Sequence, residues 1–396
     1  MKKILIILLL LINMCFFKNL VYASVTERVD KELDTTTSLD LAKNATSAIM
    51  IESSTGEVIF KKNENEKRPP ASMTKMMSML LIMEALEKGN ITLEEEVTTS
   101  AYASSMGGSQ IFLKVGEKMS VNDMLKGIAI GSANDATVAL AERIAGTEES
   151  FVKLMNDKAV SLGCKNTNFK NATGLDAENH YSTAYDMSLI AKELVRHKKI
   201  LEYTRTYEDY LRKDTSSPFW LVNTNKLVRF YSSVDGLKTG FTKEAGYCLT
   251  STAEKDNMRL ITVVMNEPTP QIRNSETTSM LDYGFNMYSI DKLLDTDTPL
   301  DKVKVDLGKT LDAEIVPTEE VKILNSKTSD KRNVTYDLEL NKIKAPVKKG
   351  DIVGTIKVYE EGNIINEIPA TVKYDIDKAS ILTIYYRNFK NLMRGF

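Results

Sequence analysis

The tetrapeptide Ser72-Met73-Thr74-Lys75 places a hydroxyl and an amine at the predicted start of a helix over about 72–88. Side chains three residues apart share one face of a helix, with Cβ atoms ~5–6 Å apart. An amine held against a hydroxyl in a partly desolvated site can lose its proton and act as a base. The tetrapeptide is not specific by itself, because Ser72 could be an ordinary helix cap and Ser289-Ile290-Asp291-Lys292 fits the same pattern.

A second candidate, Ser132-Ala133-Asn134, follows Gly131, where a helical pattern over about 121–145 is interrupted. At such a break side chains can leave the helix and face a cleft. The Ser132 hydroxyl could relay a proton, and the Asn134 amide could hold a substrate carbonyl or Lys75. The similar stretch Ser120-Val121-Asn122-Asp123 is more simply a helix cap with Ser120 first.

A third candidate, Lys238-Thr239-Gly240, stands just before a β-rich stretch. Gly240 would let a substrate backbone approach, Thr239 can bind a carboxylate, and Lys238 supplies positive charge. Taken alone, this tripeptide is typical of a loop.

The chain has only two histidines, which limits the chemistry it can perform. His180 lies in a polar loop, and His197 is expected in the basic end of a helix over about 183–196. A Ser-His-Asp triad would need one of these two residues, so a nucleophile here is expected to use another base. A His-rich metal site is nearly excluded, and neither a metal nor a cofactor is expected.

Overall composition indicates an ordinary globular protein with 42% hydrophobic and 27% charged residues. Lys+Arg (52) and Asp+Glu (54) nearly balance, and no clustered basic footprint suggests a nucleic-acid partner.

The first residues read as a signal peptide over 1–23, with a basic start, an apolar run over 4–12 and cleavage after Ala23. The run is short for a membrane-spanning helix, although an uncleaved N-terminal anchor remains an alternative. A polar linker over 24–41 is expected to follow. Cleavage would remove Cys15 and leave Cys164 and Cys248, which we expect to be buried free thiols.

The remaining patterns predict an α+β protein with a mostly antiparallel sheet flanked by helices. A β-hairpin is expected over 48–60, adjacent antiparallel strands over 247–252 and 260–265, and a helix over about 274–289. The predicted catalytic domain covers 42–293. Period-two alternation then predicts a small all-β domain over 297–375.

The segment 376–396 is predicted to form an amphipathic helix. Its apolar face contains Ile381, Ile384, Tyr385, Phe389, Leu392, Met393 and Phe396, and its basic face contains Arg387, Lys390 and Arg394. Such a helix suits the surface of an anionic membrane. The alternative is a helix that packs on the β domain.

The three motifs occur in this order, with 60 and then 106 residues between their starts. Together they resemble the low-molecular-mass penicillin-binding proteins, the serine D-Ala-D-Ala carboxypeptidases, whose catalytic domain has the β-lactamase/transpeptidase-like (penicilloyl-serine transferase) fold. The resemblance covers about 42–290 and extends to 106–110, 133–136, 171–175, 180–184 and 238–248.

This resemblance implies that Ser72 attacks the bond between two terminal D-alanines of a peptidoglycan stem peptide, with Lys75 as general base. Which group takes the first proton is disputed for such enzymes. Ser132 would pass the proton to the leaving D-alanine, and Asn134 would position the substrate. The family's remaining contacts would be Lys238 and Thr239 with the terminal carboxylate, Gly240 with the substrate backbone, and an oxyanion hole from the N–H groups of Ser72 and Phe241.

The resemblance also implies that penicillin and other β-lactams acylate Ser72, and that the enzyme works at the outer face of the cytoplasmic membrane or in the cell wall. A class A β-lactamase is the nearest rival interpretation, but the Glu-x-x-x-Asn pattern of its deacylating glutamate is absent after Ser132. Two further interpretations are a non-catalytic penicillin-binding sensor and an endopeptidase of the same chemistry.

Overall fold

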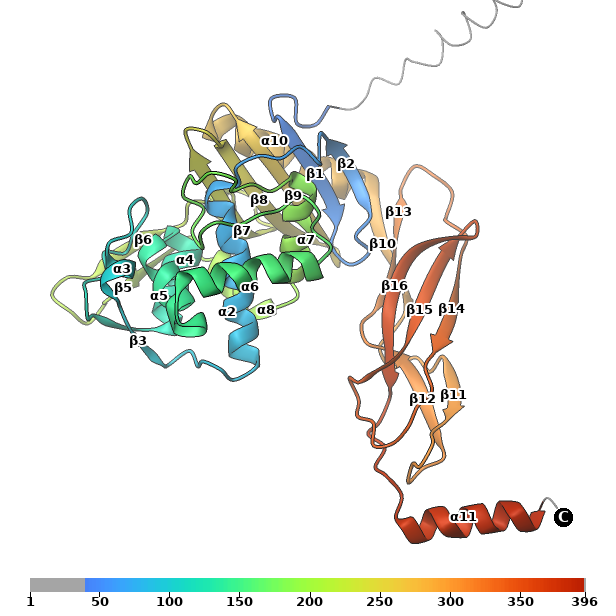
Figure 1. The fold of residues 1–396 in the computed structure, drawn as a ribbon. Helices are drawn as coiled ribbons and strands as arrows, with labels where there is room; N and C mark the ends of the chain where they lie inside the picture. Colours follow the sequence, from blue (N-terminus) through green and yellow to red (C-terminus); the bar gives the residue numbers. More distant parts are fainter. Residues whose placement is uncertain (1–39, 395–396) are drawn as a thin grey trace, which may run out of the picture. The chain divides into compact units, whose positions relative to one another are not determined.

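The computed structural model describes residues 40–394. The predicted signal peptide, Cys15 and nearly all of the predicted linker lie outside these residues. The α+β prediction is confirmed: a large antiparallel sheet with helices comes first, and a β-rich region with a last helix follows (Figure 1). We call residues 42–287 the N-terminal region and residues 288–394 the C-terminal region.

A five-stranded antiparallel sheet forms the centre of the N-terminal region, in the order β2-β1-β9-β8-β7. Its strands are β1 (Ser47–Glu52), β2 (Val58–Lys62), β7 (Val234–Thr242), β8 (Gly246–Lys255) and β9 (Met258–Glu267). The predicted hairpin and the predicted β8–β9 pair are both present. The tripeptide Lys238-Thr239-Gly240 does not precede this sheet as predicted but lies within its edge strand β7.

Helices cover both faces of this sheet, which explains why β9 is apolar almost throughout. Ile261 and Val263 join the core around α2, whereas Leu260 lies on the other face, against Gly284 of α10. Helices α7 and α10 both pack on β9 (Figure 1).

The helices of the N-terminal region are η1 (Ala71–Thr74), α2 (Lys75–Glu87), α3 (Ala101–Ser104), α4 (Val121–Gly131), α5 (Asn134–Ala145), α6 (Glu148–Ser161), α7 (Ala184–Leu194), α8 (Lys198–Thr204), α9 (Leu227–Phe230) and α10 (Pro270–Met287). The predicted break at Gly131 separates α4 from α5, and Ser120 caps α4 by accepting a hydrogen bond from the Asp123 backbone N–H. His197 is not at the end of the preceding helix as predicted, because α7 ends at Leu194 and His197 is the N-cap residue of α8.

Two short antiparallel strand pairs, which the sequence patterns did not predict, complete the N-terminal region. They are β3 (Glu96–Thr98) with β4 (Lys118–Ser120), and β5 (Glu208–Leu211) with β6 (Phe219–Val222). Strands of three or four residues are too short to show a period in the sequence.

The C-terminal region contains a second five-stranded sheet, in the order β11-β12-β16-β15-β14, and a separate β10–β13 pair. The strands are β10 (Tyr288–Leu294), β11 (Asp301–Lys304), β12 (Asp312–Pro317), β13 (Val321–Ser326), β14 (Val334–Leu340), β15 (Ile352–Glu360) and β16 (Asn363–Val372). Strand β10 contains Ser289 and Lys292, so the second Ser-x-x-Lys match cannot place its two side chains on one face. The helix predicted over 274–289 instead starts at Pro270, after Thr269 caps it, and ends at Met287.

The last helix, α11 (Ile381–Arg394), leaves most of its large apolar side chains in solvent. Arg387 donates hydrogen bonds to the Gly308 and Lys309 carbonyls and holds the helix beside β11 and β12. The prediction of an amphipathic helix is confirmed, and most of its apolar face is exposed. Across residues 40–394, no helix has both the length and the apolar character that a membrane span requires.

A buried pair of carboxyl groups joins the end of β9 to α10. Glu267 is 1% exposed, and burial and the adjacent Glu276 carboxylate raise its pKa to about 8. Burial by itself would raise the pKa of Glu276. Hydrogen bonds from the protonated Glu267 and from Asn44 and Ala45 outweigh burial and hold this pKa below its usual value. The pair therefore keeps one proton at neutral pH.

We expect Glu267→Gln to stabilise the protein in a pH-dependent way. The unfolded chain loses this proton near pH ~4.3, so the wild type loses stability as pH rises from there to about 8. Glutamine carries no such proton, and its advantage should grow over the same interval to ~1–3 kcal/mol and then level off. Thermal unfolding at pH 4, 6 and 9 measures the stability difference between Glu267→Gln and the wild type. Glu361→Gln, at an exposed position, is the control. An advantage that is equal at pH 4 and pH 9 would contradict the shared proton.

Candidate active site

Ser72 and Lys75 meet as the spacing predicted. Lys75 Nζ lies 3.0 Å from Ser72 Oγ and also donates a 2.6 Å hydrogen bond to the Thr173 carbonyl. Ser72 is inside the 3-10 turn η1 and caps neither η1 nor α2, since neither N-cap position has a side-chain hydrogen bond. The alternative of an ordinary helix cap is thereby excluded.

The Lys75 amine is completely buried. Burial lowers its pKa well below the usual value, and the neighbouring Lys238 cation lowers it further, while Asp135 acts in the opposite sense. Burial therefore favours the uncharged amine, which is the form that a base requires. Asp135 is itself committed to backbone N–H groups, at Ile111 and Leu113.

The backbone is strained beside both hydroxyl groups of the site. Ala71, just before Ser72, has φ 48°. Ser132, the C-cap residue of α4, has φ 63°. Left-handed backbone at a residue with a Cβ is costly and persists only where its surroundings enforce it. Such strain often lies at functional sites.

Asn134 begins α5 and is 3% exposed. Its Nδ2 donates a 2.7 Å hydrogen bond to the Gly107 carbonyl, and its Oδ1 is buried without a partner. The side chain is thus oriented by the loop before α4, and its free group is an acceptor. Asn134 can accept a hydrogen bond from a substrate N–H or from Lys75 through Oδ1, and its second Nδ2 hydrogen can donate to a substrate carbonyl.

Strand β7 presents the third motif. Lys238 is 1% exposed and donates to the Thr239 carbonyl, and burial together with the charge of Arg273 lowers the Lys238 pKa to about 7. Thr239 Oγ1 donates a 2.8 Å hydrogen bond to Thr224 Oγ1. Phe241 is half exposed and stacks on Tyr247 with ring centroids 4.3 Å apart.

Gly240 has a packing role besides the predicted one. A Cβ at this position would meet the Pro70 carbonyl oxygen at 2.7 Å and the Met73 nitrogen at 3.3 Å. The glycine therefore lets β7 approach the turn that carries Ser72. Its predicted contact with a substrate backbone stays a prediction.

A cavity of about 550 Å³ joins these groups. Its lining residues are Ser72, Ser109, Ser132, Thr224, Lys226, Thr239, Gly240, Phe241, Tyr247, Pro270, Gln271, Arg273 and Asn274. Lys75, Asn134 and Lys238 are not in the lining and lie buried behind it. The cavity thus includes Arg273, a 5% exposed cation that the motifs did not indicate, because it comes from α10 and not from any of the three segments.

Two family models match the chain. A model described as D-alanyl-D-alanine carboxypeptidase matches residues 34–269, and the penicillin-binding protein 5 C-terminal domain matches residues 288–378. The D-alanyl-D-alanine carboxypeptidase DacF of Bacillus subtilis is 51% identical over 349 residues, which are 88% of this chain and 90% of that protein. The chain belongs to the D-alanyl-D-alanine carboxypeptidase family.

Solved structures agree with this assignment. Penicillin-binding protein 5 of Haemophilus influenzae is 31% identical, covers 85% of this chain and 98% of its own, and superposes with a TM-score of 0.67. Penicillin-binding protein D2 of Listeria monocytogenes in its cefotaxime-bound form is also 31% identical, covers 61% of this chain and 97% of its own, and has a TM-score of 0.56. The predicted family, enzyme class and fold are therefore confirmed.

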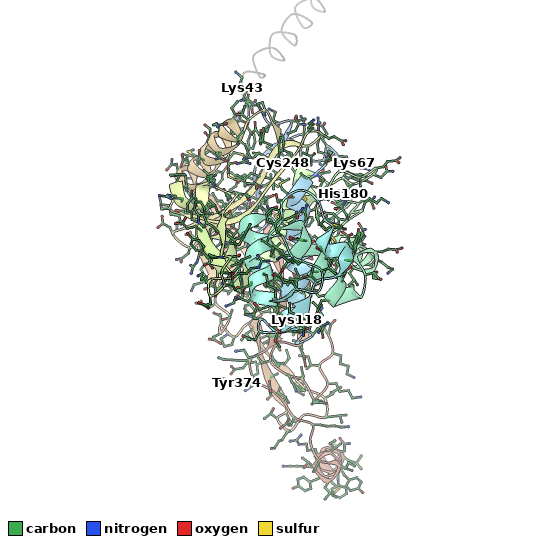
Figure 2. All side chains as sticks on the ribbon, turned by 90° about the vertical axis from the view of Figure 1, so that its left-hand side faces the viewer. Lys43, Lys67, Lys118, His180, Cys248 and Tyr374 are labelled. Atoms are coloured by element: carbon green, nitrogen blue, oxygen red, sulfur yellow. The ribbon has the colours of Figure 1, made fainter. Side chains whose placement is uncertain are left out.

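Among the described residues, neither histidine of this carboxypeptidase forms a hydrogen bond with Ser72 or Lys75. His180 lies inside the N-terminal region (Figure 2) and accepts a hydrogen bond from the Lys170 N–H, so its Nε2–H donates to Thr74 Oγ1 at 2.9 Å. Burial lowers its pKa to about 4 and keeps it neutral. Cys164 and Cys248 are buried free thiols, as predicted.

The loop that holds Lys75 depends on Gly174. Asn171 Oδ1 accepts hydrogen bonds from the Thr173 and Gly174 N–H groups, which fixes the Thr173 carbonyl against Lys75. Gly174 has φ +83°, and a Cβ there would lie 1.8 Å from the Ala71 carbonyl oxygen. The loop and the Ser72 turn can therefore meet only across a glycine.

We expect Gly174→Ala to slow acylation of the carboxypeptidase by penicillin by about a hundredfold, because the clash displaces the Ser72 turn by roughly an ångström. Gly163→Ala is the matched control, since Gly163 has φ +82° with nothing within 4 Å. Gly163→Ala should lower stability only by the ~1 kcal/mol that left-handed backbone costs a residue with a Cβ. Labelling rates with fluorescent penicillin, read beside thermal unfolding, measure both effects. Equal labelling rates in the two variants would contradict the role of Gly174.

Proposed function

We propose that this carboxypeptidase removes the terminal D-alanine of peptidoglycan stem pentapeptides through an acyl-enzyme on Ser72. The observation that carries the proposal is the fully buried Lys75 amine, whose pKa is lowered by burial and which lies 3.0 Å from Ser72 Oγ. Ser72 itself lines the cavity. This arrangement activates a serine without a histidine. We assign the catalytic domain to residues 42–293 and the β domain to 297–375.

Acylation begins when the uncharged Lys75 amine takes the Ser72 proton and Oγ attacks the carbonyl between the two D-alanines. The N–H groups of Ser72 and Phe241 serve as the oxyanion hole. The proton then passes from Lys75 to the leaving D-alanine nitrogen, through the Ser132 hydroxyl. Asn134 contributes through its free Oδ1, which accepts from the substrate amide.

The leaving residue carries a carboxylate, and the β7 side of the cavity suits it. Thr239 offers a hydroxyl, and Lys238 and Arg273 supply positive charge beside it. A bound carboxylate raises the pKa of Lys238 and so favours its charged form. We add Arg273 to the predicted substrate-binding residues Asn134, Lys238, Thr239, Gly240 and Phe241.

Deacylation uses the same base. Water enters after D-alanine leaves, and Lys75 takes its proton as the hydroxide attacks the carbonyl carbon of the Ser72 ester. The bond between this carbon and Ser72 Oγ then breaks, and Lys75 returns the proton to Oγ. None of the described residues that line the cavity carries a carboxylate. This supports a carboxypeptidase over a class A β-lactamase, whose deacylation relies on a glutamate.

The reaction predicts that the purified protein releases D-alanine from an acyl-L-Lys-D-Ala-D-Ala peptide. Ser72→Ala should abolish release, because residual catalysis without the nucleophile falls by about 10⁶ in serine peptidases. The substitution Ser289→Ala is the matched control, because Ser289 belongs to the second Ser-x-x-Lys match on β10. D-alanine is measured over time beside penicillin hydrolysis. Fast penicillin turnover without D-alanine release would favour a β-lactamase, and slow acylation without release would favour a sensor.

We also propose that the enzyme is exported and held at the outer face of the cytoplasmic membrane by α11. The signal-peptide pattern over 1–23 supports export. Helix α11 exposes one apolar and one basic face, and Ile381, Tyr385 and Phe389 are each more than half exposed. A helix of this kind lies in the membrane interface and does not span it.

This proposal predicts that Tyr385→Glu weakens binding to anionic phospholipid vesicles by about tenfold, through lost apolar insertion and added charge. The variant Thr383→Glu adds the same charge on the other face. The Thr383 N–H already donates to the Ser380 hydroxyl, so a glutamate there also suits the helix start. Vesicle co-sedimentation compares the two variants with a chain that ends at Asp375. Equal binding by all of them would rule out α11 as the anchor.

A further inference from the structure

Three donor side chains converge at the end of α2 that is remote from Lys75. They are Glu84 in the last turn of α2, Glu193 in the last turn of α7, and His197 at the start of α8. One ligand atom from each lies within 4.8 Å of the other two. Ligands at ~2.1 Å from a tetrahedral zinc ion are ~3.4 Å apart, so small side-chain rotations close the gap.

His197 gives an independent sign of a ligand. Its side chain is 10% exposed, and Nε2 is buried without a hydrogen-bond partner. The other nitrogen, Nδ1, lies 2.7 Å from Glu87 Oε1. A carboxylate that accepts the Nδ1 proton leaves the Nε2 lone pair free, and this is the second-shell arrangement of zinc-bound histidines. A buried nitrogen lone pair with no donor to satisfy it is otherwise unfavourable.

The charge around these groups also suits a cation. The negative ends of the α2 and α7 dipoles lie where Glu84 and Glu193 stand. In the structure, Lys158 from α6 supplies the compensating charge, with Nζ 2.5 Å from Glu84 and 3.7 Å from Glu193. Lys88 and Arg196 also contact these carboxylates but are more than half exposed, so their ion pairs contribute little.

We propose that Glu84, Glu193 and His197 form a binding site for a divalent metal ion of the zinc class. One imidazole and two carboxylates fill three positions of a tetrahedral zinc ion, with water as the fourth. The imidazole disfavours calcium and magnesium, which prefer oxygen ligands alone. The ion replaces the Lys158 ammonium and joins α2, α7 and α8. Its role is structural, because Glu84 is ~13 Å along α2 from Lys75.

Zinc binding to the purified, tag-free protein tests this proposal, by calorimetry after chelator treatment. One zinc ion per chain is expected, and calcium should not compete. His197→Gln should weaken binding at least ~10-fold, and Glu87→Ala, which removes the second-shell carboxylate, should weaken it ~10-fold. Lys158→Gln should tighten it ~5-fold, because the competing cation is gone. Glu202→Gln, an exposed glutamate on α8, is the matched control and should bind as the wild type does.

Penicillin labelling of Ser72 at the wild-type rate shows that each variant is folded, since none of these residues belongs to the catalytic site. Zinc should also raise the unfolding temperature of the wild type and not that of His197→Gln. The absence of saturable binding, or equal affinity in His197→Gln and wild type, overturns the site. Unchanged affinity in Lys158→Gln overturns the exchange of ammonium for metal.

Discussion

The catalytic chemistry depends on one contact, the buried Lys75 amine held between Ser72 Oγ and the Thr173 carbonyl. A charged ammonium would be costly to bury there, so burial itself supplies the base by favouring the uncharged form. The Thr173 carbonyl orients the amine, which leaves its lone pair for the serine proton. Without burial the amine would stay charged, and without the carbonyl it would not point at the serine.

Three segments of the surrounding structure converge to form that contact. The Ser72 turn, the 171–174 loop and strand β7 are distant in the sequence, and each approaches the others through a glycine or a strained residue. The absence of a Cβ at Gly174 leaves room for the Ala71 carbonyl, and its absence at Gly240 leaves room for the Pro70 carbonyl. Ala71 itself adopts φ 48°. One helix alone cannot bury the Lys75 amine and also orient it toward Ser72. The Ser72 turn, the 171–174 loop and strand β7 all have to pack around it.

Local patterns in the sequence predicted the features that depend on residues close together along the chain. The i, i+3 spacing placed Ser72 and Lys75 on one face, Gly131 marked the break before Ser132, and Ser120 was recognised as a cap. Contacts between distant segments could not be predicted in this way. Nothing near Arg273 indicates that α10 brings it into the cavity, and the meaning of Gly240 depends on the Pro70 carbonyl, which lies far away in sequence.

Helix α2 separates two electrostatic environments that would otherwise interfere. Its first residue, Lys75, lies where burial favours the uncharged amine, whereas its last turn carries Glu84 close to Lys158. The two are ~13 Å apart along the helix, and charges at the partly exposed far end are screened over ~8–10 Å. The field of the acidic cluster therefore reaches Lys75 only weakly. Ions or substitutions at that end act on catalysis only by moving the helix, and the packing of α4, α5, α6 and α7 around α2 resists such movement.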